Sequence, residues 1–470
     1  MNLPASFIDN IRHLLGNEAL EELLSALQKE ASVSIRLHPL ASSFIKKDHR
    51  LTPIPWSTQG YYLDKRLTFT FDPLFHAGCY YVQEASSMFV EQVLKTYVET
   101  PVVMLDLCAA PGGKSTHACS VLPEGSLLVA NEVNKLRSHI LSENLIKWGN
   151  PNVVVTNNDP SDFKKLTNVF DVILTDVPCS GEGMFRKDLG AIDEWSPENV
   201  EICWQRQRRI ISDIWPSLKP GGLLIYSTCT YNTKENEENI AWIEQELGAE
   251  VLPVATHEDW AITGSLLEGH DRPVYRFLPH RTRGEGFFLA VLRKSSEEEE
   301  DSFKSPISKK KMKKQSSVSP FPKEMMAQAE HWVDNENYCL LSTDSQIVAF
   351  PKDYMDVLER LKPMLRIIQT GVTVGELKGK DLLPAHSFAM SRLLRPSCFP
   401  SEEIDYDRAI AYLRKEAISL SETAPRGFVL LTYQQIPLGF VKNIGNRANN
   451  LYPQEWRIRT TRLPEDLSTL

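Results

Sequence analysis

The chain lacks several features that would define its class at once. Its eight cysteines include no pair with the two-residue spacing of a zinc knuckle, which argues against a structural metal site. No run approaches the ~18 apolar residues of a membrane span. The first residues, MNLPASFIDN, do not have the basic, apolar and small-residue layout of a signal peptide. We therefore expect a cytoplasmic protein with no membrane partner and no metal, in which most cysteines are buried free thiols.

Excess positive charge is also missing, because the formal net charge is −9 at pH 7. A protein that coats nucleic acid indiscriminately would be basic, although a local basic groove is compatible with an acidic total. Hydrophobic residues make up 42% of the chain and charged residues 24%, which is typical of a globular protein with a sizeable core. A length of 470 residues predicts two or three domains.

The chain divides at a segment of low apolar content. Residues 295–320 (SSEEEEDSFKSPISKKKMKKQSSVSP) combine an acidic block, a basic block and serines, which predicts a flexible charged linker. Other changes of pattern define an N-terminal segment with helical periodicity at 1–95, an alternating strand and helix domain at 96–294, an accessory α/β region at 321–420 and a small β-rich domain at 421–470.

Strands and helices alternate through residues 96–294. Strands are predicted at 102–108, 126–132, 152–159, 170–176 and 221–229, and helices at 113–121, 134–148 and 197–218. This alternation predicts right-handed βαβ units and a parallel sheet with helices on both faces, which is a doubly wound, Rossmann-like α/β fold. Such sheets bind ligands at the carboxyl ends of their strands, where the motifs described next are expected.

The first motif, LDLCAAPGGKST (105–116), leads from a strand through a Pro-Gly-Gly turn into a helix. Gly112 and Gly113 let a ligand approach the backbone, and the amide groups of the helix then face it. A P-loop would need glycine at Cys108, and the G-x-G-x-x-G pattern of dinucleotide binding is also missing. Glu132 closes the second strand, where an acid accepts hydrogen bonds from ribose hydroxyls, and Asp159 closes the third, placed to meet an adenine edge. A purely structural turn is the alternative.

Two further motifs each carry a cysteine. FDVILTDVPCSGEGMFRKD (170–188) places Asp176 and Cys179 after the fourth strand, and PGGLLIYSTCTYNTKENEENI (220–240) places Cys229 after the fifth. One cysteine after a strand is most often a small buried hydrophobe. Two in polar turns on adjacent strands predict that both thiols face one side of a shared pocket.

A pair of thiols suits methyl transfer to carbon five of cytosine. That carbon is a poor nucleophile until a thiolate adds to carbon six and converts the ring into an enamine. A free thiol has a pKa of about 8.5, so a nearby positive sulfonium would assist its ionisation. Asp176 is placed to bond the polar edge of the base, which must be turned out of any stack to reach the pocket.

The motifs DLCAAPGGKS, TDVPCSGEG and YSTCTYN together resemble the NOL1/NOP2/Sun family of RNA cytosine carbon-five methyltransferases, and YYVQEASSM (80–88) and RFLPHRTRGEGFFLAVLRK (276–294) extend the similarity over 30–294. The resemblance implies a class I methyltransferase that uses S-adenosyl-L-methionine, with Cys229 as the nucleophile and Cys179 assisting product release. Ser115 stands where relatives often have threonine. The resemblance implies the following cofactor contacts: Cys108, Ala109, Ala110, Pro111, Gly112, Gly113, Lys114, Glu132, Asp159 and Asp176.

The choice of nucleophile is left open by the chemistry of the residues alone. DNA cytosine methyltransferases use the cysteine of a Pro-Cys pair, which in this chain is Cys179. The STCTYN motif around Cys229 and the Ser-Gly pair after Cys179 favour the arrangement of the RNA enzymes. We therefore expect RNA and not DNA as the partner.

Basic residues outside the motifs are candidate phosphate contacts, although ordinary surface charge explains each of them singly. The candidates are Arg36, Lys46, Lys47, Arg50, Arg186, Lys187, Arg206, Arg208, Arg209, His280, Arg281 and Arg283. Residues 426–462 interleave six basic residues (Arg426, Lys442, Arg447, Arg457, Arg459, Arg462) with Phe428, Tyr433, Phe440, Tyr452 and Trp456. A small barrel that grips structured RNA would have this composition, and a β-rich domain with an aromatic core is the alternative.

This tail is similar to the PUA-like region of the bacterial RsmF-like branch of the family. That similarity implies ribosomal RNA, or the small ribosomal subunit, as the substrate. Two alternatives remain at this stage, namely transfer RNA as the substrate and a non-catalytic ribosome assembly factor that keeps the fold only to hold RNA. The sequence does not define the oligomeric state or the modified nucleotide.

Overall fold

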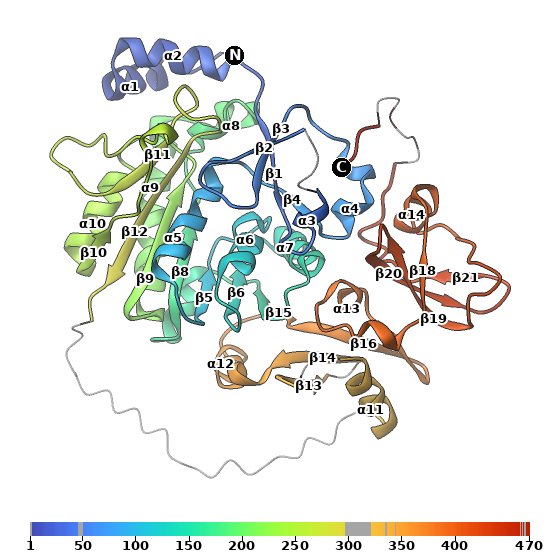
Figure 1. Ribbon diagram of the computed structural model, residues 1–470. Helices are drawn as coiled ribbons and strands as arrows, with labels where there is room; N and C mark the ends of the chain where they lie inside the picture. The colour runs from blue at the N-terminus through green and yellow to red at the C-terminus, as the bar shows by residue number, and fades with distance from the viewer. Residues whose placement is uncertain are drawn as a thin grey trace, which may run out of the picture.

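The computed structural model describes residues 2–45, 50–296, 321–333, 336–343, 345–460, 462, 464 and 467–470. Figure 1 shows a large central sheet, with two helices from the N-terminus above it and the β-rich C-terminal half beside it. The predicted linker at 295–320 lies almost entirely outside the described residues. Across the described ranges, each helix is too short or too polar to cross a lipid bilayer.

The central sheet has the strand order β10-β12-β9-β8-β5-β6-β7-β15, and β11 pairs with β12. Its parallel strands are β5 (Val103–Asp106), β6 (Leu127–Asn131), β7 (Val153–Thr156), β8 (Phe170–Asp176) and β9 (Leu218–Thr228). These correspond to the five predicted strands, and the Rossmann-like prediction is confirmed.

The sheet is mixed, however, and not purely parallel as the alternation predicted. The antiparallel strands β12 (Phe287–Lys294), β10 (Ala249–Leu252) and β11 (Val274–Phe277) extend the edge beside β9. At the other edge, β15 (Ile367–Thr370) from the second half of the chain pairs antiparallel with β7. An exposed edge strand is a template for unwanted pairing, so β15 protects the sheet of the first half.

Helices cover both faces of this sheet. One face packs against α5 (Val90–Tyr97), α6 (Gly113–Val121) and α7 (Lys135–Trp148), and the other against α9 (Pro197–Ile214), α10 (Glu237–Leu247) and α12 (Met355–Leu361). Leu128 of β6 faces the first layer and Val129 the second, and both side chains are buried. Burial on both faces explains why these strands are nearly continuous apolar runs.

The N-terminal region is only partly helical. Helices α1 (Ala5–Leu15) and α2 (Asn17–Leu27) follow the predicted periodicity, and they pack against the segment that contains α8 (Leu189–Glu194). The rest forms an unpredicted sheet with the order β2-β3-β1-β4. It consists of β1 (Val33–Leu37), β2 (Leu51–Pro53), β3 (Gly60–Leu63) and β4 (Tyr80–Val82), with the short helices α3 (Ser42–Ile45) and α4 (Pro73–His76). Strands this short show too little alternation to be recognised.

The described residues of the second half form two four-stranded sheets. The first comprises β13 (Tyr338–Ser342), β14 (Gln346–Pro351), β16 (Val372–Lys378) and β17 (Asp381–Pro384), with α11 (Lys323–Trp332) and α13 (His386–Met390) packed in its core. The second comprises β18 (Ser401–Glu403), β19 (Gly427–Tyr433), β20 (Ile436–Asn443) and β21 (Ala448–Asn450), packed on α14 (Tyr406–Leu413). Phe440 and Tyr452 lie in the cores of this half, whereas Arg426, Arg447 and Arg459 are exposed.

His386 connects the stability of this arrangement to pH. Its buried ring meets the edges of the Tyr452 and Trp456 rings, and neither of its ring nitrogens has a hydrogen-bond partner among the described residues. Burial, and then the charges of Lys147, His76 and Lys415, lower the pKa of His386 to about 3. The folded protein therefore holds His386 neutral, while the unfolded chain takes up a proton near pH 6.5.

The stabilisation from a neutral His386 is complete above about pH 6.5 and is lost as the pH falls toward the folded pKa. Between about pH 7.5 and about pH 5.5, we expect His386→Phe to lose about 1 kcal/mol less unfolding free energy than the unaltered protein. Urea unfolding of both proteins at the two pH values measures this difference. Identical losses would show that His386 does not carry this pH dependence.

Candidate active site

Two adjacent strands bring the two predicted cysteines together. Asp176 at the end of β8 is the register partner of Ser227 in β9, so the loops that follow lie side by side. The Sγ atoms of Cys179 and Cys229 are 3.2 Å apart, and both thiols are free. The backbone N–H of Cys229 also points at Sγ of Cys179, at 3.4 Å. The predicted convergence of the two thiols is confirmed.

The surroundings of Cys179 favour its neutral form. The hydrogen bond between the sulfurs, together with burial and the neighbouring charges of Cys229 and Glu235, raises the pKa of Cys179 well above its ordinary value. Cys179 therefore remains a protonated thiol near neutral pH. The two sulfurs lie within hydrogen-bond distance, and a protonated Cys179 can donate to the sulfur of Cys229.

A fixed ion pair stands beside the sulfurs. Nζ of Lys114 lies 2.8 Å from Oδ2 of Asp176, and Oγ of Ser227 donates to Oδ1 of the same carboxylate at 2.8 Å. Burial acts to lower the pKa of Lys114, but the charge and hydrogen bond of Asp176 outweigh it, so the pKa is raised. The predicted residues Lys114 and Asp176 thus meet at the carboxyl end of β8 as a charged pair.

The glycine turn is held in place from α7. Gly112 has a φ of 114°, which L side chains rarely adopt, and an added Cβ would lie 3.3 Å from Leu141. The guanidinium of Arg137 donates to the carbonyl oxygen of Ala110 at 2.7 Å, and the amide of Asn144 donates to that of Pro111 at 2.8 Å. The backbone of the turn at the start of α6 is therefore held by two side chains of α7.

Three carboxylates converge on this turn. Burial raises the pKa of Cys108, and the charges of Asp106, Asp176 and Glu132 raise it further. Asp106 is fully buried, and its pKa is raised to about 7, chiefly by burial. Asp176 and Glu132 already have the cationic partners Lys114 and Arg137, but Oδ1 of Asp106 is buried with no hydrogen-bond partner among the described residues, so it is free to accept from a donor on a bound ligand. S-adenosylmethionine carries a sulfonium and an ammonium group, so the residues present match what that cofactor needs.

The predicted nucleoside contacts differ in exposure. Glu132 is buried and accepts from the backbone N–H of Asn134 at 2.8 Å. The side chain of Asp159 is 41% exposed, and Ser161 donates to it through its backbone N–H and its hydroxyl. Burial opposes the ionisation of Asp159, but the hydrogen bonds from Ser161 outweigh it and lower its pKa. Among the described residues, no three or more His, Cys, Asp or Glu side chains are grouped as a metal site.

Two of the predicted phosphate contacts are wrong. Arg36 is fully buried, donates to Oγ1 of Thr116 at 2.6 Å and lies over the Trp148 ring, so it connects the N-terminal sheet to α6. Arg186 is nearly buried and forms an ion pair with Glu285. A guanidinium with these partners and this burial has no surface left for RNA. Lys46 and Lys47 lie outside the described residues.

The sequence argument missed four polar side chains near the cysteines. Glu182, Asn232 and Glu235 join the two cysteine loops through hydrogen bonds, and Asp106 lies beneath the glycine turn. Glu182 and Glu235 are present in the sequence as acids beside the cysteine motifs, in SGEG and NTKENEEN, and Asp106 lies inside the first motif, in LDLC. Acids are common in surface turns, so these acids were not distinguished from ordinary surface residues.

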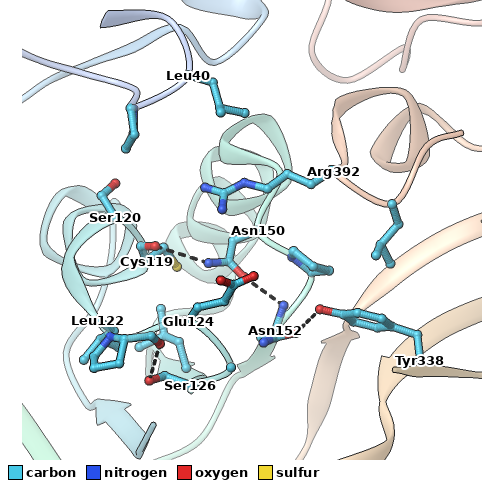
Figure 2. A pocket seen from close by; sticks show the side chains of 16 residues that line it. Leu40, Cys119, Ser120, Leu122, Glu124, Ser126, Asn150, Asn152, Tyr338 and Arg392 are labelled. Atoms are coloured by element: carbon cyan, nitrogen blue, oxygen red, sulfur yellow. Dashed lines mark hydrogen bonds between the residues drawn. The ribbon is translucent and has the colours of Figure 1, made fainter. Parts of the chain in front are cut away.

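A cavity of about 350 Å³ lies at the amino ends of β6 and β7, where Leu40, Arg392 and the loop before β6 meet (Figure 2). Its polar groups already bond to one another: Asn150 donates to the carbonyl oxygen of Cys119, and the hydroxyl of Tyr338 donates to Asn152. This cavity is therefore a seam between the two halves of the chain and is separate from the cysteine site.

Comparison with family models matches three parts of the chain. Residues 93–293 match the model described as 16S rRNA methyltransferase RsmB/F, residues 3–85 match the N-terminal domain of 16S rRNA methyltransferase RsmF, and residues 399–458 match the methyltransferase RsmF PUA domain. Together these matches include the glycine turn, both cysteine loops and the sheet that starts at β18.

Comparison with individual proteins gives similarity over nearly the full length. The chain is 30% identical to ribosomal RNA small subunit methyltransferase F of Cronobacter sakazakii, over 96% of each chain. A solved methyltransferase homologue from Pyrococcus horikoshii superposes with a TM-score of 0.53 at 28% identity, over 61% of this chain and 94% of that one. A structure of NSun6 from Pyrococcus horikoshii with SFG shares the fold, with a TM-score of 0.52 at 22% identity over 62% of this chain and 98% of that one.

Proposed function

The chain belongs to the RsmB/F family of 16S rRNA methyltransferases, and from that premise we propose how its own residues methylate carbon five of a cytosine. The enzyme is an S-adenosylmethionine-dependent RNA cytosine methyltransferase. The observation that carries the proposed mechanism is the 3.2 Å contact between the sulfurs of Cys179 and Cys229, beside the Lys114–Asp176 pair. S-adenosylmethionine supplies the methyl group as an electrophile on its sulfonium.

The first step is nucleophilic addition by Cys229. Its thiolate forms a bond to carbon six of the cytosine, and the electron pair of the C5=C6 bond moves so that carbon five becomes nucleophilic. Asp176, held by Lys114 and Ser227, is placed to bond the polar edge of the ring and to balance the charge that develops there. Carbon five then takes the methyl group.

The second step restores the aromatic ring. Water takes the proton from carbon five, the electron pair of that C–H bond reforms the C5=C6 bond, and the bond between Sγ of Cys229 and carbon six breaks, so that Cys229 leaves as a thiolate. Because Cys179 is held as a thiol, it donates a hydrogen bond to the thiolate of Cys229 as that sulfur departs. Cys179 therefore assists product release.

The cofactor contacts are proposed for the backbone of 108–114, for Glu132 and for Asp159, with Asp176 between the cofactor and the base. We also propose that residues 1–95 and the C-terminal PUA-like unit contact RNA. The sheet of that unit includes β18, so we place its start near Ser401 and not at residue 421. The region between the linker and Ser401 protects the central sheet through β15. We expect the protein to act in the cytoplasm, on small-subunit RNA or on the assembled subunit.

Bisulfite sequencing of cellular RNA tests the substrate. A methyl group on carbon five protects a cytosine from conversion by bisulfite. Deleting the gene is expected to remove this protection from one or more cytosines of 16S rRNA, and a plasmid copy should restore it. A matched copy with Cys398→Ala should restore it as well, because Cys398 lies in the second half and contacts the carbonyl oxygen of His331. Protection lost only in transfer RNA would make transfer RNA the substrate. Unchanged protection everywhere would favour an assembly factor.

A further inference from the structure

The two cysteine loops hold each other through a reciprocal pair of buried carboxylates. Glu182 follows Cys179 in its loop, and its Oε2 accepts hydrogen bonds from the backbone N–H groups of Tyr231 and Asn232 at 2.7 and 2.9 Å. These two amides belong to the other loop, two and three residues after Cys229. The carboxylate of one loop therefore fixes the backbone of the loop that holds the other cysteine.

The second carboxylate makes the same connection in the opposite direction. Glu235 follows Cys229, and its Oε2 accepts from the backbone N–H of Ser180 at 3.0 Å, in the loop that carries Cys179. The hydroxyl of Ser180 donates to Oε1 of the same carboxylate. Gln207 of α9 donates to Oε2 at 2.7 Å, which anchors the carboxylate to the helix layer.

Asn232 joins the two carboxylates. Its side-chain amide donates to Oε1 of Glu235 at 2.8 Å and to Oε1 of Glu182 at 3.2 Å, and its Oδ1 accepts from the backbone N–H of Glu235. Glu182 is 1% exposed and Glu235 is fully buried, so water does not compete with these bonds. Hydrogen bonds to an ionised acceptor are stronger than neutral ones.

From this arrangement, which we call the carboxylate clasp (Glu182, Asn232 and Glu235), we propose that these three residues are positioning residues for the methyl transfer. The clasp fixes the distance between the two sulfurs, and it does so without touching the cofactor turn. This inference rests on the proposed function for its catalytic consequence, but the distance that it predicts is a property of the protein alone.

Trivalent arsenicals provide a test that needs neither RNA nor cofactor, because they bind tightly only where two thiols lie close together. We expect the unaltered protein to bind one phenylarsine oxide, and Cys179→Ala or Cys229→Ala to abolish that binding. The indole N–H of Trp195 is a fourth donor to Glu182, beside the backbone and side-chain donors of Tyr231 and Asn232. Glu182→Gln should weaken arsenical binding at least about 10-fold, because an amide cannot accept from all four donors and the loops separate. Asp72→Asn is the matched control, since Asp72 is another buried carboxylate with three hydrogen-bond donors, far along the chain from the cysteines.

The same variants predict a split in the kinetics. A displacement of about 1 Å at a reacting group costs roughly 100-fold in rate. Glu182→Gln is therefore expected to lower kcat about 100-fold, while the KM for S-adenosylmethionine changes less than about twofold. If Glu182→Gln does not fold, Asn232→Ser removes the central amide and keeps both carboxylates, and it should show the same two effects in weaker form.

Arsenical affinity and kcat that both equal those of Asp72→Asn would overturn the clasp and leave the proposed function intact. Arsenical binding that weakens as expected, in a protein that methylates no cytosine, would support the clasp and overturn the proposed function. A loss of unfolding free energy alone, with both other readouts unchanged, would make Glu182 a purely structural residue.

Discussion

Cys229→Ala is expected to lower methyl transfer to small-subunit RNA about 1,000-fold or more, because we propose that Cys229 supplies the thiolate that activates carbon five. Cys229 lies at the carboxyl end of β9, with its sulfur 3.2 Å from that of Cys179. Transfer of a tritiated methyl group to RNA measures the rate. Binding of S-adenosylmethionine, measured by calorimetry, should stay unchanged, because the turn at 108–114 follows β5, whereas Cys229 follows β9.

Cys203→Ala is the matched control for this variant. Cys203 is also buried, but it lies in α9, where its nearest polar contact is a weak one to Asn199 at 3.9 Å. We expect its transfer rate to stay within about twofold of that of the unaltered protein. A Cys229→Ala protein that still transfers methyl groups at a comparable rate would make Cys179 the nucleophile, as in the DNA enzymes.

Cys179→Ala has a different expected result, which is a trapped intermediate. Without the thiol that donates to the departing sulfur, the bond between Cys229 and carbon six breaks slowly, and a covalent protein–RNA adduct accumulates. Turnover should fall about 100-fold, the scale of losing one positioned proton donor. A denaturing gel detects the adduct as a band that carries both protein and RNA.

The double variant Cys179→Ala with Cys229→Ala separates the two roles. It should form no adduct, because the addition that precedes release is lost. An adduct that accumulates in Cys229→Ala and not in Cys179→Ala would reverse the assignment of the two cysteines.

The sequence was informative where local patterns determine local structure. The apolar runs at β5 to β9 predicted the sheet, because a strand that is buried on both faces consists almost entirely of apolar residues. The order of those strands then predicted that Cys179 and Cys229 would converge, since both follow carboxyl ends of neighbouring strands. Where the order of the strands determines which side chains meet, the site can be predicted from the sequence alone.

The remaining features depend on contacts between distant residues. The sequence predicted Arg36 as a phosphate contact, yet it is buried against Thr116 and Trp148. The residues next to an arginine in the sequence do not indicate whether it is buried. The pairing of β15 with β7 joins residues far apart in the chain, so periodicity could not show that the sheet is mixed. The bonds from Glu182 and Glu235 likewise run between two loops and are visible only in the folded chain.

Mapping the trapped bond tests the central claim most directly. Small-subunit RNA transcribed with 5-fluorocytidine cannot lose a proton from carbon five, so the adduct with the unaltered enzyme and S-adenosylmethionine should persist. After digestion with trypsin and ribonuclease, tandem mass spectrometry locates the nucleotide on a cysteine. We predict the modified nucleotide on the peptide that contains Cys229. Its attachment to the peptide that contains Cys179, or the lack of any adduct with this RNA, would contradict the account.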